Sequence, residues 1–498
     1  MNLYHYCVFF ANRNSTLPCK ILEFAALIPE NMRMYGEHKH YLDNTMPIAR
    51  YSLSNRAVAC AGRLRRTQPA RISGIVTNLL GLMVEVEGLT GLAAMGDRLA
   101  LRTSDGRLVP AEVIGFRDTA LQVMAFGSLD GLAHGAKAEW HGRSHAMLDV
   151  ASSWLGRVID PLGNPLDHAG FLFGGPTSKA TRTAPPEATS RARLGPRIDL
   201  GVRALNCFVT CRQGQRLGLF AGSGVGKSTL LSMLTRWTAC DVVVLALVGE
   251  RGREVREFIE NDLGPDGLAR AVVVVATSDA PPLMRRQCAY TAMAVAEHFR
   301  DQGLSVLLLM DSVTRFCLAL REIALSLGEP PATRGYPPSV FAELPRLLER
   351  AGPGPMLPDG SAGQITGMFS VLVEGDDHNE PVADAIRGIL DGQIVMDRKI
   401  AEAGRYPAID VLRSLSRVAA SCLDEAQAAT VRRVRGILSL HGDMADMVRL
   451  GAYRSGTDAA VDEALRLNPA IEEFLRQAPV ERTGFDESFT RLNQILGA

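Results

Sequence analysis

Residues 215–229 read Gln215-Arg-Leu-Gly-Leu-Phe-Ala-Gly-Ser-Gly-Val-Gly-Lys-Ser-Thr229. The apolar run from Arg216 to Phe220 predicts a short strand, and the turn after it, from Ala221 to Gly226, is rich in glycine. Lys227 and Ser228 then open a helical run. A strand, a glycine-rich loop and Lys-Ser at the start of a helix are typical of loops that hold the phosphates of a nucleotide.

The loop predicts a defined set of phosphate contacts. Its glycines allow backbone angles that turn successive N–H groups inward, and the helix N-terminus adds a positive field. Lys227 is expected to reach the β- and γ-phosphates, and Ser228 to bind Mg²⁺. The loop matches a relaxed form of the phosphate-loop pattern, because Ala221 replaces its first glycine. The alternative interpretation is a glycine-rich turn that binds nothing. The predicted binding set is Gly222, Ser223, Gly224, Val225, Gly226, Lys227, Ser228 and Thr229.

Lysine is rare in the rest of the chain. Six of the 54 basic residues are lysine, at positions 20, 39, 137, 179, 227 and 399. A lysine at this place in so arginine-rich a chain indicates that the planar fork of arginine would not fit where a compact ammonium is needed.

The composition narrows the classes of protein. A length of 498 residues predicts two to four domains, and 47% hydrophobic with 22% charged residues is ordinary for a globular chain. A formal net charge of zero argues against nucleic acid or an anionic membrane as the main partner. The nine cysteines include no C-x-x-C pair, which predicts neither a zinc site nor a disulfide framework and fits a reducing cytosol. No apolar run approaches the length of a membrane span.

Residues 1–65 carry the weakest pattern. The apolar run at 8–11 is too short for a signal peptide, and no Lys or Arg precedes it. Residues 22–34 could form an amphipathic helix. Two interpretations stay open: an unmatched leader that is poorly ordered, with Met34 or Met46 as alternative starts, and a helix that binds a partner.

From residue 66 to 143 the sequence changes to short strands separated by glycine-containing turns. This spacing predicts a small N-terminal β-barrel or sandwich. A barrel that binds RNA needs stacking aromatic residues and a basic face. This segment has few aromatic residues and mixed charge, so a structural or ring-forming barrel is favoured. The expected strands begin at Ile72, Leu82, Arg98, Val109 and Leu121.

Residues 144–422 are predicted to form the nucleotide-binding domain. Its apolar, β-branched strands alternate with helices, which is the pattern of a mostly parallel, buried sheet. Residues 423–498 predict a helical domain, with helices at 425–441, 456–467, 471–477 and 485–496. The expected fold class is therefore α/β: a P-loop NTPase core with a mostly parallel sheet, preceded by the small barrel and followed by the C-terminal helical domain.

Two strands of this core end in acidic residues. Leu307-Leu-Leu-Met-Asp311 is an apolar strand that ends in a carboxylate, which downstream of a phosphate loop predicts support for Mg²⁺. The alternative is an N-cap for the next helix. Another strand ends at Glu250. Ligands bind beyond the carboxyl ends of the strands in such sheets, so Glu250 is expected to polarise an attacking water; its alternative is an ion pair on a surface loop.

The chain also contains longer motifs, which give it a resemblance to a known family. They are Ala221-Gly-Ser-Gly-Val-Gly-Lys-Ser228, Gly249-Glu-Arg-Gly-Arg-Glu-Val-Arg-Glu-Phe258, Asp311-Ser-Val-Thr-Arg-Phe316, Gly328-Glu-Pro-Pro-Ala-Thr-Arg-Gly-Tyr-Pro-Pro-Ser-Val-Phe-Ala-Glu-Leu-Pro345, Tyr406-Pro-Ala-Ile-Asp410 and Ser414-Leu-Ser-Arg-Val418. From about residue 71 onward the chain resembles the rotary ATPase superfamily, the catalytic subunits of ATP synthases and their secretion relatives. Within it, the motifs resemble most the flagellar protein-export ATPases, also called flagellum-specific ATP synthases.

The resemblance implies catalytic roles for matching residues. Lys227 and Ser228 would bind phosphate and Mg²⁺, and Asp311 would support the metal. Glu250 would be the catalytic carboxylate, with Arg251 beside it. ATP and Mg²⁺ are the implied cofactors.

Two further matches complete the implied site. Tyr406 would stack on the adenine ring, as an aromatic face can. Arg417 would be an arginine finger that acts in the site of a neighbouring subunit; its alternative is an ordinary salt bridge. If the finger acts between subunits, an isolated monomer is a poor enzyme, and a homohexamer would supply the neighbour.

The implied function is Mg-dependent ATP hydrolysis that energises the unfolding and export of flagellar proteins through a type III export apparatus. The implied partners, besides the other subunits, are a stator-like regulator at the N-terminal region, a central-stalk-like protein, an export-gate membrane protein and chaperone-bound export substrates; nucleic acid is not among them. The implied location is cytoplasmic and peripheral at the inner-membrane export apparatus.

Two other functions stay open. The first is the ATPase of a type III injectisome, which has the same chemistry and different partners. The second, from another class, is an RNA-dependent hexameric translocase that resembles the transcription terminator Rho. Neutral charge and an aromatic-poor barrel argue against the second. The runs 398–404 and 485–489 resemble the flagellar proteins more than the injectisome ones.

Overall fold

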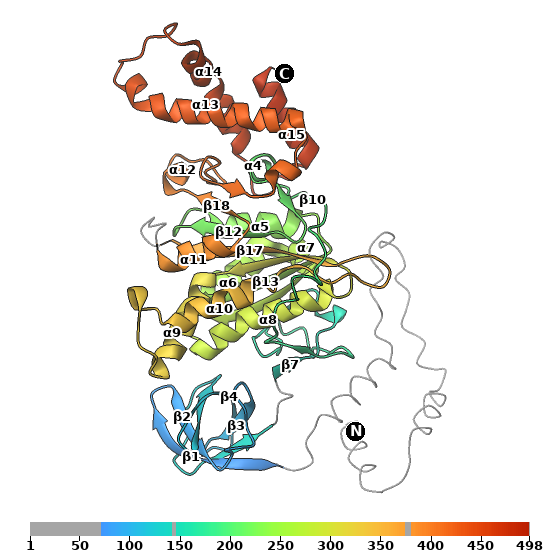
Figure 1. Ribbon diagram of the computed structural model, residues 1–498, viewed down its shortest axis with the longest axis vertical. Coiled ribbons are helices and arrows are strands. Elements are labelled where there is room, and N and C mark those ends of the chain that lie inside the picture. Colours follow the sequence, from blue (N-terminus) through green and yellow to red (C-terminus); the bar gives the residue numbers. More distant parts are fainter. Residues whose placement is uncertain (1–70, 142–145, 374–379, 498) are drawn as a thin grey trace. The chain divides into compact units, whose positions relative to one another are not determined.

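The computed structural model describes residues 71–141, 146–373 and 380–497, so the two interpretations of the leader lie outside the described residues. Along the described chain a β-barrel is followed by a sheet with helices and then by helices alone (Figure 1). This order confirms the predicted fold class. In the described ranges no helix combines the length and the apolar composition needed to cross a membrane.

The N-terminal strands form a closed barrel in the order β1-β2-β5-β4-β3-β6. Five of the six strands were expected, whereas β6 was not, because four residues carry too little pattern. The segment becomes a strand because it pairs with both β1 and β3 and closes the barrel, which removes the exposed edges. The strands are β1 (Ile72–Leu80), β2 (Met83–Glu87), β3 (Arg98–Arg102), β4 (Leu108–Arg117), β5 (Ala120–Ala125) and β6 (Lys137–Trp140).

The central sheet has the order β19-β18-β12-β17-β15-β13-β14-β8, and every pair from β18 to β8 is parallel. The predicted parallel sheet is therefore confirmed. The short β19 and β16 pair antiparallel at its margins. Its strands are β8 (Arg157–Ile159), β12 (Arg216–Ala221), β13 (Val242–Glu250), β14 (Ala271–Thr277), β15 (Ser305–Asp311), β16 (Gly352–Pro353), β17 (Gln364–Leu372), β18 (Gly392–Met396) and β19 (Leu415–Ser416); outside it lie β7 (Met147–Leu148), β9 (Lys179–Ala180), β10 (Arg197–Ile198) and β11 (Cys211–Arg212).

Both faces of this sheet are covered, which explains its continuous apolar runs. In β13, Val243 and Leu245 point into one hydrophobic cluster, while Val244 and Ala246 point into the other, as successive side chains of a strand must. The helices of this region are α4 (Arg203–Phe208), α5 (Lys227–Trp237), α6 (Gly252–Glu257), α7 (Gly264–Ala269), α8 (Pro282–Arg300), α9 (Val313–Ser326), α10 (Pro338–Leu348), α11 (Pro381–Ile389) and α12 (Arg398–Glu402).

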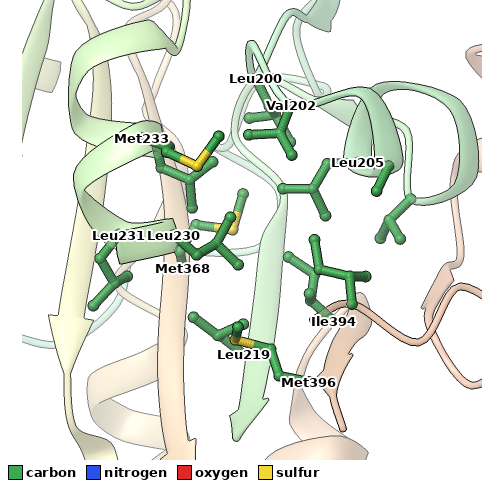
Figure 2. Close-up of a cluster of buried hydrophobic side chains, with 14 of the residues drawn as sticks. Leu200, Val202, Leu205, Leu219, Leu230, Leu231, Met233, Met368, Ile394 and Met396 are labelled. Atoms are coloured by element: carbon green, nitrogen blue, oxygen red, sulfur yellow. The ribbon is translucent and has the colours of Figure 1, made fainter. Parts of the chain in front are cut away.

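Apolar packing holds the glycine-rich loop from both of its ends. Figure 2 shows Leu219 of β12 and Leu230 of α5 in one cluster with Met368 of β17 and Ile394 of β18. These side chains are buried. The strand before the loop and the helix after it are therefore fixed by the same core, although the loop itself has few side chains to pack.

The C-terminal region consists of α13 (Glu425–Arg449), α14 (Ala459–Leu475) and α15 (Phe485–Leu496). The prediction of two helices at 456–467 and 471–477 was wrong, because α14 continues through Pro469. Proline inside a helix removes a hydrogen bond and crowds the preceding turn. Leu467 and Ile471 on either side of it are buried in the same core as α4 and α5, and this packing outweighs the local cost.

Candidate functional site

The loop between β12 and α5 leaves the first amides of the helix without a side-chain cap. Gly224 and Gly226 have φ values of 78° and 84°, in the left-handed region that glycine adopts without strain. Gly226 is the N-cap of α5, and no side chain of the described residues accepts a hydrogen bond from the first turn. These N–H groups and the helix dipole together form a place for an anion.

The other loop residues divide into buried and accessible positions. Gly222 and Val225 are buried, and the side chain of Val225 belongs to the hydrophobic core. Ser223 and Ser228 are exposed, and Thr229 is half-buried in the first turn of α5. The Ser228 hydroxyl is thus accessible at the start of the helix.

Three charged side chains meet beside this loop. Lys227 comes from the start of α5, while Glu250 and Asp311 end the neighbouring parallel strands β13 and β15. The Lys227 Nζ contacts Asp311 Oδ1 and lies 3.9 Å from Glu250 Oε1. All three side chains are at most 12% exposed. Ser370 of β17 donates a hydrogen bond of 2.5 Å to Asp311 Oδ1.

The carboxylate of Glu250 is held in an unusual electrostatic environment. Burial raises the pKa of Glu250, and the nearby Asp311 carboxylate raises that pKa further. Lys227 and Arg315 act in the opposite direction, but the net pKa stays above its ordinary value of 4.5. A carboxylate whose pKa is raised toward neutrality is a better proton acceptor than an ordinary glutamate.

Arg315 was not singled out from the sequence, although it lies within the motif that begins at Asp311. Its Nε lies 3.3 Å from Glu250 Oε1, and its side chain is 28% exposed. It stands in the first turn of α9, directly after the strand that ends in Asp311. The signal that could have identified it is a cation one helical turn after the acidic end of a strand.

Arg251 is not brought into this group. Its side chain is 75% exposed and forms an ion pair of 3.0 Å with Glu254 on the same turn of α6. The structure therefore places Arg251 beside Glu250 in sequence, with its guanidinium directed to the surface.

Tyr406 lies against the glycine-rich loop at Gly226. A Cβ added to Gly226 would lie 3.1 Å from Cδ1 of Tyr406, so the ring contacts the loop directly. The ring is also partly accessible, since Tyr406 is 43% exposed. It lines a cavity of about 860 Å³ whose walls include Phe474 at the end of α14 and Gln477 just after that helix. Neither residue could be found from the sequence, because nearly 250 positions separate them from the loop.

Arg417 occupies a different position from the other predicted site residues. It follows the edge strand β19 and is exposed. Its backbone N–H donates to the Asp391 carbonyl at 3.0 Å. Among the described residues its guanidinium forms no hydrogen bond or ion pair, so the side chain is available to a group from outside the chain.

The oxygen donors at the site fit a magnesium ion. The Ser228 hydroxyl and the Asp311 carboxylate are hard ligands of the kind Mg²⁺ prefers. Within the described ranges no cluster of three or more His, Cys, Asp or Glu side chains forms a closed metal cage. Mg²⁺ at nucleotide sites takes one or two protein ligands and completes its shell with phosphates and water, which matches this donor set.

Comparisons with known proteins identify the family of this chain. Family models match three successive parts of the chain: the ATP synthase alpha/beta beta-barrel domain at residues 76–140, the nucleotide-binding domain of the same family at 201–416, and the T3SS EscN ATPase C-terminal domain at 423–494. A flagellum-specific ATP synthase of Caulobacter vibrioides is 53% identical over 434 residues, which cover 87% of this chain and 98% of the relative. The chain belongs to the ATP synthase alpha/beta family. This family member is an ATPase of the branch that contains the flagellar and type III secretion proteins.

Two further relatives of this ATPase come from type III secretion. A type 3 secretion system ATPase of Xanthomonas euvesicatoria is 45% identical over 424 residues, which cover 85% of this chain and 93% of the relative. The solved structure of assembled EscN with its central stalk EscO, from enteropathogenic E. coli, has a TM-score of 0.77 and 36% identity, and covers 85% of this chain and all of that one. The ATPase therefore shares its fold with an enzyme that has been seen assembled.

Proposed function

We propose that this ATPase hydrolyses Mg-ATP at the place where Lys227, Glu250 and Asp311 meet, with the adenine ring against Tyr406. The observation that carries the proposal is the convergence of these charged side chains from three elements beside an uncapped helix N-terminus. The second support is the half-exposed Tyr406 ring between the loop and a cavity. Phosphates and base would thus each meet a surface of matching chemistry.

Each residue of the proposed site would have its own role in ATP hydrolysis. The loop amides and Lys227 would bind the β- and γ-phosphates, and Lys227 would then exchange the Asp311 carboxylate for phosphate oxygens. Ser228 and Asp311 would hold Mg²⁺, which neutralises phosphate charge when it is bound. Glu250 would orient the attacking water and accept its proton, because its raised pKa suits a base. Arg315, on the other side of Glu250, would hold this carboxylate in position.

Replacing Glu250 with Gln tests the assignment. The substitution keeps the shape and removes the base, so we expect nucleotide affinity within a few-fold of wild type and a kcat lowered by about 10² to 10⁴. The measurement pairs equilibrium binding of a fluorescent ATP analogue with steady-state phosphate release. Glu254→Gln is the matched control, since Glu254 is an exposed acid on the next turn. Full turnover in Glu250→Gln would refute the role of Glu250.

We also propose that the working enzyme is a homohexamer in which Arg417 completes the neighbour's site. The exposed guanidinium, with no partner among the described residues, supports this arrangement. The assembled relative that is solved with its central stalk supports a ring and a central-stalk-like partner. The hexamer would work at the inner-membrane export apparatus with a stator-like regulator at the N-terminal region, an export-gate protein and chaperone-bound substrates. Each subunit would consist of a barrel domain (66–143), a nucleotide-binding domain (144–422) and a helical domain (423–498).

The proposed role is flagellar protein export. It is supported by the 53% identity to a flagellum-specific ATP synthase. The injectisome role remains the second candidate, because a type 3 secretion relative is 45% identical over a similar length. The RNA-translocase alternative is disfavoured, since the barrel and C-terminal models both belong to the ATP synthase and secretion families. Expression in strains that lack either their flagellar or their injectisome ATPase separates the two: restored motility and flagellin secretion support the flagellar role, and restored effector secretion alone contradicts it.

A further inference from the structure

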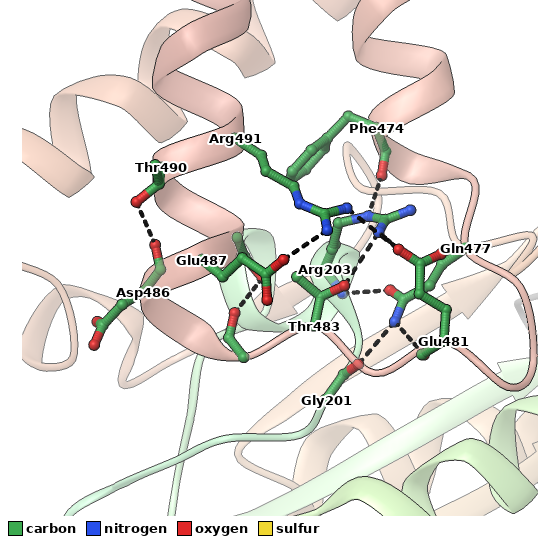
Figure 3. Close-up of polar contacts among 12 residues, drawn as sticks. Gly201, Arg203, Phe474, Gln477, Glu481, Thr483, Asp486, Glu487, Thr490 and Arg491 are labelled. Carbon is green, nitrogen blue, oxygen red and sulfur yellow. Dashed lines mark hydrogen bonds and ion pairs between the residues drawn. The ribbon is translucent and has the colours of Figure 1, made fainter.

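The segment that joins α14 to α15 forms one wall of the cavity beside Tyr406, and it is fixed by a polar network. Figure 3 shows this segment wrapped around Arg203 at the start of α4. Gln477 and Glu481 of the segment line the cavity together with Phe474 of α14 and with Arg203. The network and the cavity wall are therefore made of the same residues.

Gln477 forms hydrogen bonds with its backbone N–H and with both polar atoms of its side chain. Its backbone N–H donates to the Tyr406 carbonyl at 2.9 Å. Its side-chain Oε1 accepts from the Arg203 N–H at 2.8 Å, and its Nε2 donates to the carbonyls of Gly201 and Glu481, both at 2.8 Å. The side chain is 3% exposed. A buried amide with all of its groups satisfied fixes its surroundings in one arrangement.

Arg203 holds the same segment at four further points. Its Nε donates to the Phe474 carbonyl at 2.7 Å, and its Nη2 contacts the Arg476 carbonyl. Its Nη1 binds Glu481 and donates to the Thr483 hydroxyl at 3.1 Å. The guanidinium is buried and planar, so these contacts define both the path and the orientation of the segment.

The network also reaches the helix that follows the phosphate loop. Gly201 has a φ of 72°, and a Cβ at this position would lie 2.3 Å from Cβ of Trp237, the last residue of α5. The Gly201 carbonyl, which accepts from Gln477, is thus anchored against α5. Gln477 therefore joins three parts of the chain: its side chain contacts Gly201 beside α5 and Arg203 of α4, and its backbone N–H bonds the loop that carries Tyr406.

We propose that Gln477 and Arg203 are positioning residues that set the selectivity of the site for its nucleotide base. The inference rests on the proposed placement of adenine against Tyr406. Gln477 fixes the backbone of Tyr406, which supplies the stacking surface, to the segment that supplies the opposite wall. Replacing the Gln477 side chain removes its bonds to Gly201 and Arg203, so the segment whose backbone bonds Tyr406 is held less firmly and the two walls of the cavity are free to separate. A pocket whose walls move rejects the wrong base less well than a fixed one. Phosphate binding and water activation use other residues and keep their geometry.

The test compares ATP with GTP in Gln477→Leu and Arg203→Lys, using the full-length chain. We expect KM for ATP to rise about tenfold, the ratio of kcat/KM for ATP to that for GTP to fall about tenfold, and kcat to stay within about twofold. Thr490→Val is the matched control: Thr490 donates one hydrogen bond to the Asp486 carbonyl on the outer side of the same region. Equal losses for both nucleotides, or a loss in kcat with selectivity preserved, would overturn the proposal.

Hydrogen exchange in the wild-type protein provides a second test that does not depend on the folding of the variants. Hydrogen exchange at the Gln477 amide should slow when a non-hydrolysable ATP analogue binds and should be unchanged with inorganic tripolyphosphate, because only the base reaches the cavity. Equal protection by both ligands, or by neither, contradicts the inference. Tyr406→Ala distinguishes the proposed adenine site from the proposed role of Gln477. An unchanged KM for ATP in Tyr406→Ala would refute the placement of adenine against Tyr406. A raised KM in Tyr406→Ala, together with normal kinetics in Gln477→Leu, would refute only the positioning role of Gln477.

Discussion

At the scale of single residues, one lysine of the candidate site lies between two carboxylates. Lys227 contacts Asp311 and lies within 4 Å of Glu250. In the proposed site, a nucleotide would compete with these carboxylates for the Lys227 ammonium, and the greater charge of the phosphates would favour the nucleotide. If Lys227 moved to the phosphates, Glu250 would lose part of the cationic field that lowers its pKa.

This environment predicts the acid limb of the pH profile. As the proposed base, Glu250 would have to be ionised, so kcat/KM should fall as the pH decreases through the Glu250 pKa, which burial and Asp311 raise above 4.5. Arg315 lowers that pKa, so Arg315→Gln should move the limb to higher pH. The profile is measured as kcat/KM from pH 5 to 9. Arg321→Gln on the same helix is the control, and a limb that stays in place in Arg315→Gln would contradict the electrostatic account.

At the scale of elements, the barrel is joined to α8 by a buried charge cluster. Glu112 of β4 accepts a hydrogen bond of 2.6 Å from Arg286 of α8, and Arg98 of β3 lies 3.3 Å from its other oxygen. Burial alone would raise the pKa of Glu112, but Arg286 and Arg98 outweigh it, and the pKa is lowered. Folding therefore favours the ionised carboxylate. The stabilisation is present above the unfolded-state pKa and is lost as the pH falls through the lower native pKa.

Removing this single charge should destabilise the joint. Glu112→Gln leaves the buried guanidinium groups of Arg286 and Arg98 without a counter-ion, so we expect the free energy of unfolding to fall by about 3 to 5 kcal/mol at pH 7. Urea denaturation followed by circular dichroism measures the change. Asp105→Asn removes an exposed ion pair with Arg107 on the same barrel and should leave stability nearly unchanged. Equal midpoints for both variants would show that the buried cluster contributes little.

At the scale of the whole molecule, the C-terminal helices are part of the nucleotide-binding unit. Val434, Ile471 and Phe489 belong to the same hydrophobic core as Leu205 and Leu230. The α14–α15 segment also supplies a wall of the cavity beside Tyr406. The C-terminal helices are therefore packed directly against the elements that carry the phosphate loop.

The ring proposal predicts how activity depends on concentration. Specific ATPase activity should rise with protein concentration as subunits assemble, and Arg417→Ala should assemble normally with a kcat lowered by about 10³ or more. Light scattering gives the size and phosphate release gives the rate. Arg413→Ala is the control, because Arg413 lies just before β19, as Arg417 lies just after it, and pairs with Asp397 of its own chain. Activity that is independent of concentration, with an unimpaired Arg417→Ala, would place the complete site within one subunit.

The sequence by itself determined the local elements and the chemistry at their ends. The glycine-rich loop, the apolar strand that ends in Asp311 and the alternation of strands with helices depend on short-range pattern, and each appears where it was expected. Parallel strands bring their carboxyl ends to one edge, so the pattern placed Glu250 and Asp311 at the same edge of the sheet, whereas the strand order that makes β13 and β15 neighbours came from the tertiary structure.

Only the tertiary structure decided what depends on distant partners. β6 is a strand because it pairs with both β1 and β3. α14 continues through Pro469 because the burial of its apolar face outweighs the hydrogen bond that proline removes. The wall of the cavity comes from residues almost 250 positions after the phosphate loop, and Arg251 points away from the acid it follows. Local propensity is fixed by neighbours in the chain, whereas packing energies and side-chain directions are fixed by neighbours in space.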